Sequence, residues 1–364
     1  MKILIMGFAK IKYMPYLHFY LNNIDCEKND VHLLYWNRDL ADEPLEQFDK
    51  LTLHEFRLYQ EDDVSPVKKI VGFLKYQQFA SKILKQSFDR VIALHTFPGI
   101  LNLDRLKKHY RGRYIFDYRD KTYEGLGFFK KWIAQLVEYS CASFVSSDGF
   151  REVLPDSPKL HTSHNLSVED LPLRQGLIPG GNPNERIRLG FWGFIRNEET
   201  NRILIEKIAA DPRFELHYYG REQAIAKNLK AYAATLTDRV FFHGEYQPKD
   251  RRSFVADTDL IHNIYEHGNM TAAMANKYYD GALFRLPQIC MPDSYMGRRA
   301  EEAEIGFCCD PAAEDFTQQV YSYFTNLDRE AFDRRCEAEL AHILEEYNNG
   351  CAIIRKMTTK EAEA

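Results

Sequence analysis

The amino-acid sequence predicts an α/β protein of two domains, each built on a parallel β-sheet, that face each other across a central cleft. Three observations support this prediction. Strand-like runs alternate with helix-like runs twice over, which is typical of parallel sheets with right-handed crossovers. A stretch rich in proline and glycine at residues 171–184 interrupts the alternation. The chain has 364 residues, which is enough for two domains of ordinary size.

The first domain is expected to comprise residues 1–172. Its strands are predicted from short runs of apolar residues. These expected strands are Lys2–Gly7, Val31–Trp36, Val91–His95, Tyr114–Tyr118 and Ala142–Ser146. Helical patterns fill most of the gaps between the strands, including residues 13–23 and 66–86.

A linker is expected at residues 173–186 and the second domain at residues 187–344. The expected strands of this domain are Ile187–Gly193, Phe214–Gly220, Val240–His243, Asp259–Ile264, Pro287–Met291 and Ile305–Cys309. The chain ends in a charged helical run from Asp328. We expect the last part of this run, residues 345–364, to pack back on the first domain.

Composition argues against several classes of protein. The formal net charge of −5 argues against a general nucleic-acid binder. The seven cysteines lack a CxxC pair, which predicts free thiols rather than a disulfide framework or a zinc site. Free thiols are typical of the reducing cytoplasm, where we expect the protein to be located. The first strand is too short for a signal peptide, and no apolar run approaches the roughly 20 residues of a membrane span.

A candidate phosphate site follows the first strand of the second domain, in the segment Gly193-Phe-Ile-Arg196-Asn-Glu-Glu-Thr-Asn201. Glycine lets the backbone approach a ligand, and the start of the next helix offers unpaired N–H groups. Arg196 adds a fork of donors that suits phosphate oxygens. The alternative is an ordinary strand–helix turn with Arg196 on the surface. A complete GxGxxG is absent, which argues against a dinucleotide site.

Two further strands of the second domain end in glycine turns. Gly220 and Arg221 follow one strand, and Gly244 and Tyr246 follow the other. Their backbone and aromatic ring are suited to hold a base by hydrogen bonding and stacking. The alternative is that they are plain turns.

The segment Asn276-Lys-Tyr-Tyr-Asp280 is expected to begin a helix. Lys277 and Asp280 are three residues apart and therefore share one face of that helix. The Asp280 carboxylate is suited to accept both hydroxyls of a ribose, and the alternative is a solvated ion pair with Lys277. Glu266 lies in the polar loop before the helix, where it would face a bound sugar.

Polar residues also end two strands of the first domain. His95 follows one apolar strand, and Asp117 and Asp120 lie at the end of the next. The carboxyl edge of a parallel sheet is where ligands bind, although a structural role is the alternative for His95. Asp257-Thr-Asp259 has the spacing of metal-bound nucleotide-sugar sites, but Asp259 leads into a buried strand. No metal site is therefore expected.

The helix at residues 66–90 combines lysines with interleaved apolar residues, and residues 128–132 repeat this composition. A basic amphipathic helix can lie on an anionic bilayer. The alternative is a helix packed on the sheet with a lysine-rich outer face. The basic residues of the longer segment are Lys68, Lys69, Lys75, Lys82, Lys85 and Arg90.

Together these segments resemble the GT-B glycosyltransferases, most closely the family 4 enzymes of bacterial capsule and exopolysaccharide synthesis. Residues 190–196 resemble the phosphate-loop strand of that family. Residues 276–280 followed by 286–289 resemble its NKLYD…KPxI signature, and His95 and residues 117–120 match two motifs that face its cleft. The resemblance covers nearly the whole chain and implies two Rossmann-like domains in the GT-B architecture.

The resemblance also implies that the second domain holds a nucleotide-sugar donor and the first domain an acceptor. Arg196 would contact the donor diphosphate, with Lys277 beside it. Asp280 would be the ribose-binding acid, and His95 would lie near the transferred sugar. The donor-binding motif also includes Asn276 and Tyr279.

The chain departs from the family pattern in three places. The acid usually found eight residues before the ribose acid falls on Ala272, so Glu266 is the substitute candidate. The lysine of the phosphate helix is absent, and Asn201 lies in its region. The first-strand loop reads Gly7-Phe-Ala-Lys10 instead of a double glycine, so Lys10 is expected on the acceptor side of the cleft.

The expected function is therefore that of a hexosyltransferase-type glycosyltransferase that takes a nucleoside-diphosphate sugar, favouring a UDP-sugar. It would act on a glycan or lipid-linked glycan hydroxyl in capsular, exo- or lipopolysaccharide synthesis, with retention and without a metal or other cofactor. A further candidate partner is an anionic membrane surface, namely the inner face of the plasma membrane. No nucleic-acid partner is expected. Two alternatives stay open: a nucleotide-sugar epimerase of the same fold and a non-catalytic nucleotide-sugar-binding protein.

Overall fold

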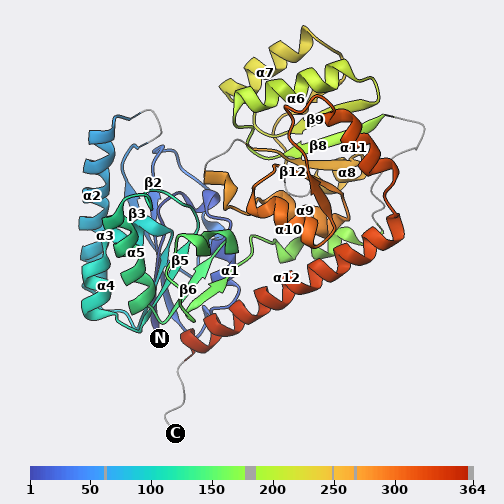
Figure 1. The fold of residues 1–364 in the computed structure, drawn as a ribbon. Helices are drawn as coiled ribbons and strands as arrows, with labels where there is room; N and C mark the ends of the chain where they lie inside the picture. The colour runs from blue at the N-terminus through green and yellow to red at the C-terminus, as the bar shows by residue number, and fades with distance from the viewer. Residues whose placement is uncertain (61–63, 177–185, 248–249, 266–268, 360–364) are drawn as a thin grey trace. The chain divides into compact units, whose positions relative to one another are not determined.

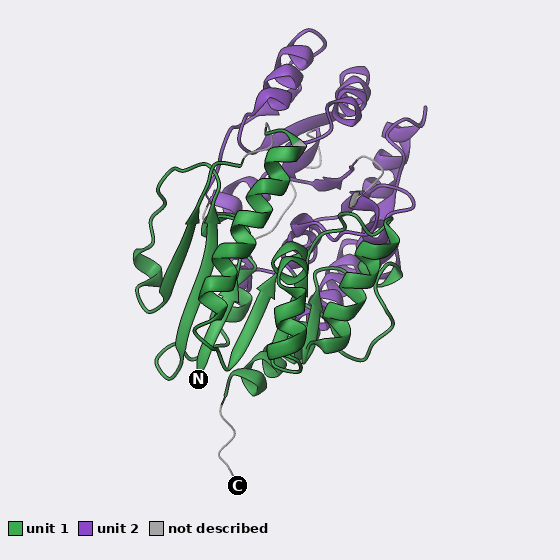
Figure 2. Cartoon of the chain, turned by 90° about the vertical axis from the view of Figure 1, so that its left-hand side faces the viewer, with its two compact units in different colours: residues 1–164, 345–364 green, residues 165–344 purple. Residues whose placement is uncertain are grey.

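The structure, a computed structural model, describes residues 1–60, 64–176, 186–247, 250–265 and 269–359. The chain forms two compact units (Figure 2). The first contains Met1–His164 together with the end of the chain from Glu345, and the second contains Asn165–Leu344. The first unit thus ends at residue 164 rather than 172. The expected linker begins inside the second unit, in the 3-10 helix η4 (Val168–Arg174), and its residues 177–185 lie outside the described residues.

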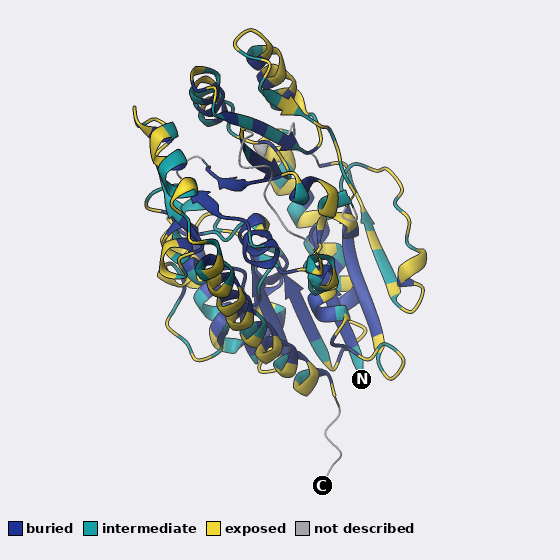
Figure 3. Ribbon diagram, turned by 90° about the vertical axis from the view of Figure 1, so that its right-hand side faces the viewer, coloured by how far each residue is buried: buried dark blue, intermediate teal, exposed yellow. Residues whose placement is uncertain are grey.

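The first unit is built on a seven-stranded sheet in the order β3-β2-β1-β4-β5-β6-β7, with parallel neighbours throughout. Its inner strands β1, β4 and β5 are buried along almost their whole length, because a parallel sheet is covered on both faces (Figure 3). The strands are β1 (Lys2–Met6), β2 (Asp30–Asn37), β3 (Thr52–Arg57), β4 (Arg90–Leu94), β5 (Tyr114–Tyr118), β6 (Ala142–Val145) and β7 (Leu160–Thr162).

Helices cover both faces of this sheet (Figure 1). One face carries α2 (Pro66–Leu84), α3 (Thr96–Leu101), α4 (Leu103–His109) and α5 (Gly127–Tyr139). The other carries α1 (Leu17–Leu21) and the end of α12 (Arg329–Thr358). These two helices touch, because the ring centre of Phe19 on α1 lies 5.2 Å from that of Tyr347 on α12. The short 3-10 helices are η1 (Ile11–Tyr13), η2 (Glu46–Phe48) and η3 (Asp148–Glu152).

The second unit is built on a six-stranded sheet in the order β10-β9-β8-β11-β12-β13, again with parallel neighbours. Neighbouring elements in sequence are strand and helix in turn, which places the carboxyl ends of all six strands at one edge. The strands are β8 (Ile187–Trp192), β9 (Phe214–Tyr219), β10 (Val240–Phe242), β11 (Leu260–Asn263), β12 (Gln288–Cys290) and β13 (Gly306–Cys308).

Two hydrophobic clusters lie on the two faces of the second sheet. One packs α6 (Glu198–Ala210), α7 (Ala224–Ala234) and α11 (Phe316–Thr325) against the strands. The other packs α8 (Arg251–Ala256), α9 (Asn276–Phe284), α10 (Tyr295–Glu302) and the start of α12. The 3-10 helix η6 (Asn269–Thr271) precedes α9.

The predicted α/β class with two parallel sheets is confirmed, and each strand expected from an apolar run is present within a few residues. Strands β3 and β7 were not predicted. They lie at the two edges of the first sheet, and β3 is a polar strand without a fully buried residue. Among the described residues, no helix combines the length and the apolar character that crossing a bilayer requires.

Candidate functional site

Three glycines predicted to bind the donor meet at the carboxyl edge of the second sheet. The Gly220 N–H donates to the Gly244 carbonyl at 2.8 Å. A Cβ on residue 220 would lie 2.0 Å from the Gly193 carbonyl oxygen. Gly193 and Gly244 have φ values of 120° and 80°, where other residues are strained. Glycine is thus required for backbone reasons, and main chain without side chains lies at the edge where α/β sheets bind ligands.

Arg196 lies exposed in the loop between β8 and α6, with its guanidinium carbon 5.2 Å from the centre of the Phe194 ring. Asn201 holds this loop in place by hydrogen bonds to its backbone. Its buried amide donates to the carbonyls of Arg196 and Asn197 at 2.7 and 2.9 Å, and its oxygen accepts from the Tyr218 hydroxyl at 2.7 Å. Asn201 was predicted to bind the donor directly. The structure instead uses its hydrogen-bonding groups to hold the loop that carries Arg196.

The N-terminus of α6 was predicted to attract a diphosphate, but its charges oppose an anion. Glu198 and Glu199 occupy the first turn, where carboxylates are favoured by the helix dipole. Glu198 accepts from Arg202 at 2.7 Å and from Asn228 at 3.2 Å. A diphosphate at this helix N-terminus stays a prediction, which these two carboxylates disfavour. The loop's contribution to an anion site comes from Arg196, and a second cation comes from another helix.

That second cation is Lys277, at the start of α9. Its side chain is only 5% exposed, and its Nζ donates to the Tyr265 hydroxyl and lies 3.9 Å from the centre of the Phe191 ring. Burial lowers the pKa of Lys277 to about 7. Asp280 opposes this shift, and the positive charge of Arg196 adds to it. Lys277 lies over Phe191 of β8, and Arg196 lies in the loop that follows β8, near enough to Lys277 to contribute to this pKa shift. An anion bound there would favour the charged form of Lys277.

Asp280 is buried one turn further along α9. Its Oδ2 accepts from Trp192 Nε1 at 2.6 Å and its Oδ1 accepts from Arg251 at 3.0 Å. The other nitrogen of the Arg251 fork donates to Asp170. Burial raises the pKa of Asp280, and Arg251 opposes the rise. Each Asp280 oxygen accepts one of these bonds and the side chain is 6% exposed, and the ribose role of Asp280 stays a prediction.

The remaining predicted donor-side residues fall into four groups. Tyr279 is buried in the hydrophobic core, so its predicted contact with the donor is replaced by a packing role. Asn276 and Arg221 are exposed, at the start of α9 and after Gly220 respectively. Tyr246 is half-buried against α8, and burial raises its pKa to about 12. Glu266 lies outside the described residues.

His262 on β11 is a neighbour of this site that sequence reasoning missed. It is fully buried, with its ring stacked on Phe191 at a centroid distance of 4.9 Å. Within the described part of the chain, neither of its ring nitrogens has a hydrogen-bond partner. Burial, with a smaller effect of Lys277, lowers the pKa of His262 to about 3, so the ring is neutral. Phe191 therefore has a neutral imidazole and the Lys277 ammonium group as neighbours.

In the first unit, His95 and Asp120 lie together at the carboxyl edge of the sheet. His95 Nε2 lies 3.3 Å from Asp120 Oδ2. The His95 backbone has φ of 78°, a strained value for a residue with a side chain. Both residues line a pocket of about 380 Å³. The structure therefore brings two of the four predicted first-domain residues into one cavity.

The other two residues are in internal ion pairs. Asp117 is fully buried and accepts from the Tyr20 hydroxyl and from Arg119, both at 2.7 Å. Lys10 is also buried, and its Nζ donates to Asp39 at 2.6 Å. Their predicted acceptor-side roles stay predictions, and an acceptor would have to compete with these partners inside the fold.

The pocket also contains residues that sequence reasoning missed, including Phe8, Arg38 and Phe97. A signal for them was present. Arg38 directly follows β2, as His95 follows β4, so the carboxyl-edge rule applies to both. No comparable signal exists for Arg251, whose role depends on its folded contacts.

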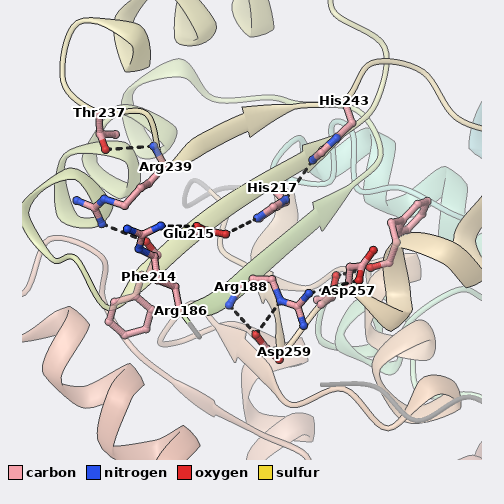
Figure 4. Close-up of polar contacts among 12 residues, drawn as sticks. Arg186, Arg188, Phe214, Glu215, His217, Thr237, Arg239, His243, Asp257 and Asp259 are labelled. Carbon is pink, nitrogen blue, oxygen red and sulfur yellow. Dashed lines mark hydrogen bonds and ion pairs between the residues drawn. The ribbon is translucent and has the colours of Figure 1, made fainter. Parts of the chain in front are cut away.

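The Asp257-Thr-Asp259 segment pairs with an arginine. Arg188 Nε donates to Asp259 at 3.2 Å and its Nη1 donates to Asp257 at 3.4 Å (Figure 4). These contacts agree with the structural interpretation of the segment. In the part of the chain that the structure describes, no group of three His, Cys, Asp or Glu side chains is placed to hold a metal ion.

Comparison with known proteins gives structural matches only. No family model matches the sequence, and no curated protein does. HepE from Anabaena in complex with UDP is 15% identical, covers 98% of each chain and has a TM-score of 0.65. Sucrose-phosphate synthase from Thermosynechococcus elongatus is 10% identical over 98% of each chain, with a TM-score of 0.68. A glycosyltransferase from Rickettsia africae is 12% identical over 99% of this chain and 100% of its own, with a TM-score of 0.66.

These matches establish the fold: the chain has the two Rossmann-like domains of the GT-B architecture. The coverage near 98% of both chains means that the match extends over both units. Membership of family 4 within this fold stays a prediction.

Proposed function

We propose that the protein is a glycosyltransferase that takes its sugar from a nucleoside-diphosphate sugar. The observation that carries this proposal is the pair of cations at the carboxyl edge of the second sheet, Arg196 and Lys277, in a fold shared with HepE in complex with UDP. Two positive charges beside glycine backbone suit a diphosphate.

In the transfer reaction the bond between the sugar C1 and the diphosphate oxygen breaks, and a bond from C1 to an acceptor oxygen forms. The acceptor hydroxyl loses its proton, and negative charge develops on the leaving diphosphate. Arg196 and protonated Lys277 stabilise that charge. Preorganised groups of this kind often make the largest single contribution to the rate enhancement. Because the pKa of Lys277 is near 7 without ligand, the diphosphate itself favours protonation of the side chain.

The finer parts of the proposal rest on the family resemblance. We infer a UDP-sugar donor, a glycan or lipid-linked glycan acceptor, retention of configuration, catalysis without a metal, and a role in capsular, exo- or lipopolysaccharide synthesis. Turnover in the presence of EDTA tests whether catalysis requires a metal ion. NMR of the product anomer tests retention of configuration. Loss of turnover with EDTA would contradict catalysis without a metal. An inverted product would contradict retention of configuration.

The function is tested by incubating the protein with UDP-sugars, with and without a panel of glycan acceptors, and measuring UDP release. A transferase releases UDP in proportion to acceptor. An epimerase converts the donor sugar without any acceptor, and a binding protein does neither while still binding UDP. Either of the last two results would replace the proposed function with the corresponding alternative.

We also propose that the first unit binds an anionic membrane surface through α2 and the start of α5. Val67 and Ile70 on α2 are 71% and 59% exposed, and Phe128 on α5 is 55% exposed, which is unusual for large apolar residues. Exposed lysines lie among them, and lysines near anionic headgroups contribute about 1 kcal/mol each. These lysines are Lys68, Lys75, Lys130 and Lys131.

Sedimentation with vesicles that contain anionic lipid tests this membrane surface. The Lys68→Glu/Lys75→Glu variant is expected to bind such vesicles at least about tenfold more weakly than the wild-type protein. The control is Lys227→Glu/Lys356→Glu, which changes charge equally at exposed positions elsewhere and is expected to bind normally. Equal loss in both variants, or no binding by the wild-type protein at low salt, would contradict the surface.

A further inference from the structure

Aromatic rings form one wall of the pocket in the first unit. Phe8 is stacked on Phe97, with ring centroids 5.3 Å apart and planes 21° apart. Phe73 from α2 lies 4.8 Å from Phe97, and Tyr13 and Tyr123 line the same cavity and are exposed. A wall of this kind holds a ring by its apolar face and contributes little selectivity for polar substituents.

A cationic end adjoins this wall. The Arg38 guanidinium lies 4.7 Å from the centre of the Phe8 ring and 4.6 Å from that of Trp36. Packing against two rings fixes the plane of the guanidinium, and a fixed plane suits a carboxylate or a phosphate. Lys69 lines the same pocket from α2. Two positively charged side chains therefore contribute to one cavity of about 380 Å³.

The other end of the wall carries the His95–Asp120 pair. The His95 ring is stacked on Phe97, with centroids 6.0 Å apart and planes 12° apart. Arg38, Phe8, Phe97 and His95 thus follow one another along a single stack. The pocket has a cation at one end, apolar rings in the middle and hydrogen-bonding groups at the other.

We propose that this pocket binds the acceptor, and that the acceptor sugar carries an anionic group, either a phosphate or a carboxylate. The anionic group lies at Arg38 and Lys69, and a hydroxyl reaches the His95–Asp120 pair. Between them, the sugar ring lies along the edges of the stacked Phe8 and Phe97 rings, beside the exposed Tyr13 and Tyr123. The identification of this ligand as the acceptor rests on the proposed function. The class of ligand rests on the pocket alone.

The test is isothermal titration of the full chain with hexose 6-phosphates and uronic acids beside their neutral parent hexoses, with UDP as a separate ligand. At least one anionic sugar is expected to bind at least about tenfold more tightly than its neutral parent. Lys69→Met should remove that preference. Lys356→Met is the matched control, since Lys356 is an exposed lysine of the same unit and does not line the pocket.

The outcomes separate the pocket from the function. If no anionic sugar binds better than its parent, or if both lysine variants lose the preference equally, the pocket proposal is overturned. Inorganic phosphate that binds as tightly as the sugar phosphates would overturn the place of the ring on the aromatic wall. If UDP binds and the sugars do not, the pocket proposal alone fails. If an anionic sugar binds through Lys69 and UDP does not bind, the proposed function fails and the ligand class stands.

Discussion

Replacing Arg196 with alanine is expected to lower kcat by about 10²–10³-fold, which is the usual loss when one preorganised donor to a developing charge is removed. Arg196 is exposed on a loop that Asn201 holds through backbone carbonyls, so its side chain does not support the fold. Thermal unfolding should therefore be unchanged. Steady-state kinetics of UDP release measure the loss, and a melting curve shows that the variant is folded.

The control for this variant is Arg334→Ala, another exposed arginine of the second unit. It removes the same charge far along the chain from the glycine turns and is expected to keep full turnover. If Arg196→Ala turned over as fast as Arg334→Ala, Arg196 would have no part in stabilising the leaving group.

Replacing Arg251 with methionine is expected to destabilise the protein by about 3–5 kcal/mol, the typical cost of removing one partner of a buried ion pair. Arg251 is the cation between Asp170 and Asp280, and all three side chains are largely buried. Without it, two carboxylates face each other with Trp192 as the remaining donor to Asp280 in this set of contacts. Chemical denaturation measures the change in the free energy of unfolding.

The second variant for this cluster is Arg251→Met/Asp280→Asn, which removes one negative charge and should recover part of the lost stability. The control is Arg252→Met, because Arg252 is exposed and its hydrogen bonds to the described residues go to the carbonyls of Leu173 and Gln175. Its expected cost is below about 1 kcal/mol. Equal stability of Arg251→Met and Arg252→Met would show that the buried carboxylates do not depend on Arg251.

The strand pattern of this chain was predictable wherever a strand lies inside a sheet. Strands β1, β4 and β8 are buried along most of their length, so their sequences are mainly apolar. Strand β3 lies at an edge, and its sequence Thr-Leu-His-Glu-Phe-Arg is half exposed. An edge strand needs no apolar run, and this is why the sequence did not reveal it.

The candidate site was predictable as far as the backbone decides it. Gly193, Gly220 and Gly244 follow strands, and turns with positive φ or close backbone contacts require glycine. Side-chain partners were not predictable in the same way. Lys277 and Asp280 share a helix face as expected, yet Lys277 donates to Tyr265 and Asp280 accepts from residues remote in sequence.

The same limit applies to Lys10 and Asp117. A charged residue near the end of a strand can point to solvent or into the fold, and only the partners decide which. Asp39 lies 29 residues from Lys10 and Tyr20 lies 97 residues from Asp117. The sequence pattern carries no information about such pairs.

The measurement that tests the donor site most directly is the dissociation constant of UDP, by isothermal titration, for the wild-type protein, Arg196→Ala and Arg334→Ala. We expect the wild-type protein and Arg334→Ala to bind UDP equally. Arg196→Ala should bind it about tenfold to a hundredfold more weakly, because a hydrogen bond between charged groups contributes about 1.5–3 kcal/mol. Equal UDP affinity in all three proteins, or no binding by the wild-type protein, would contradict a donor diphosphate at Arg196 and Lys277.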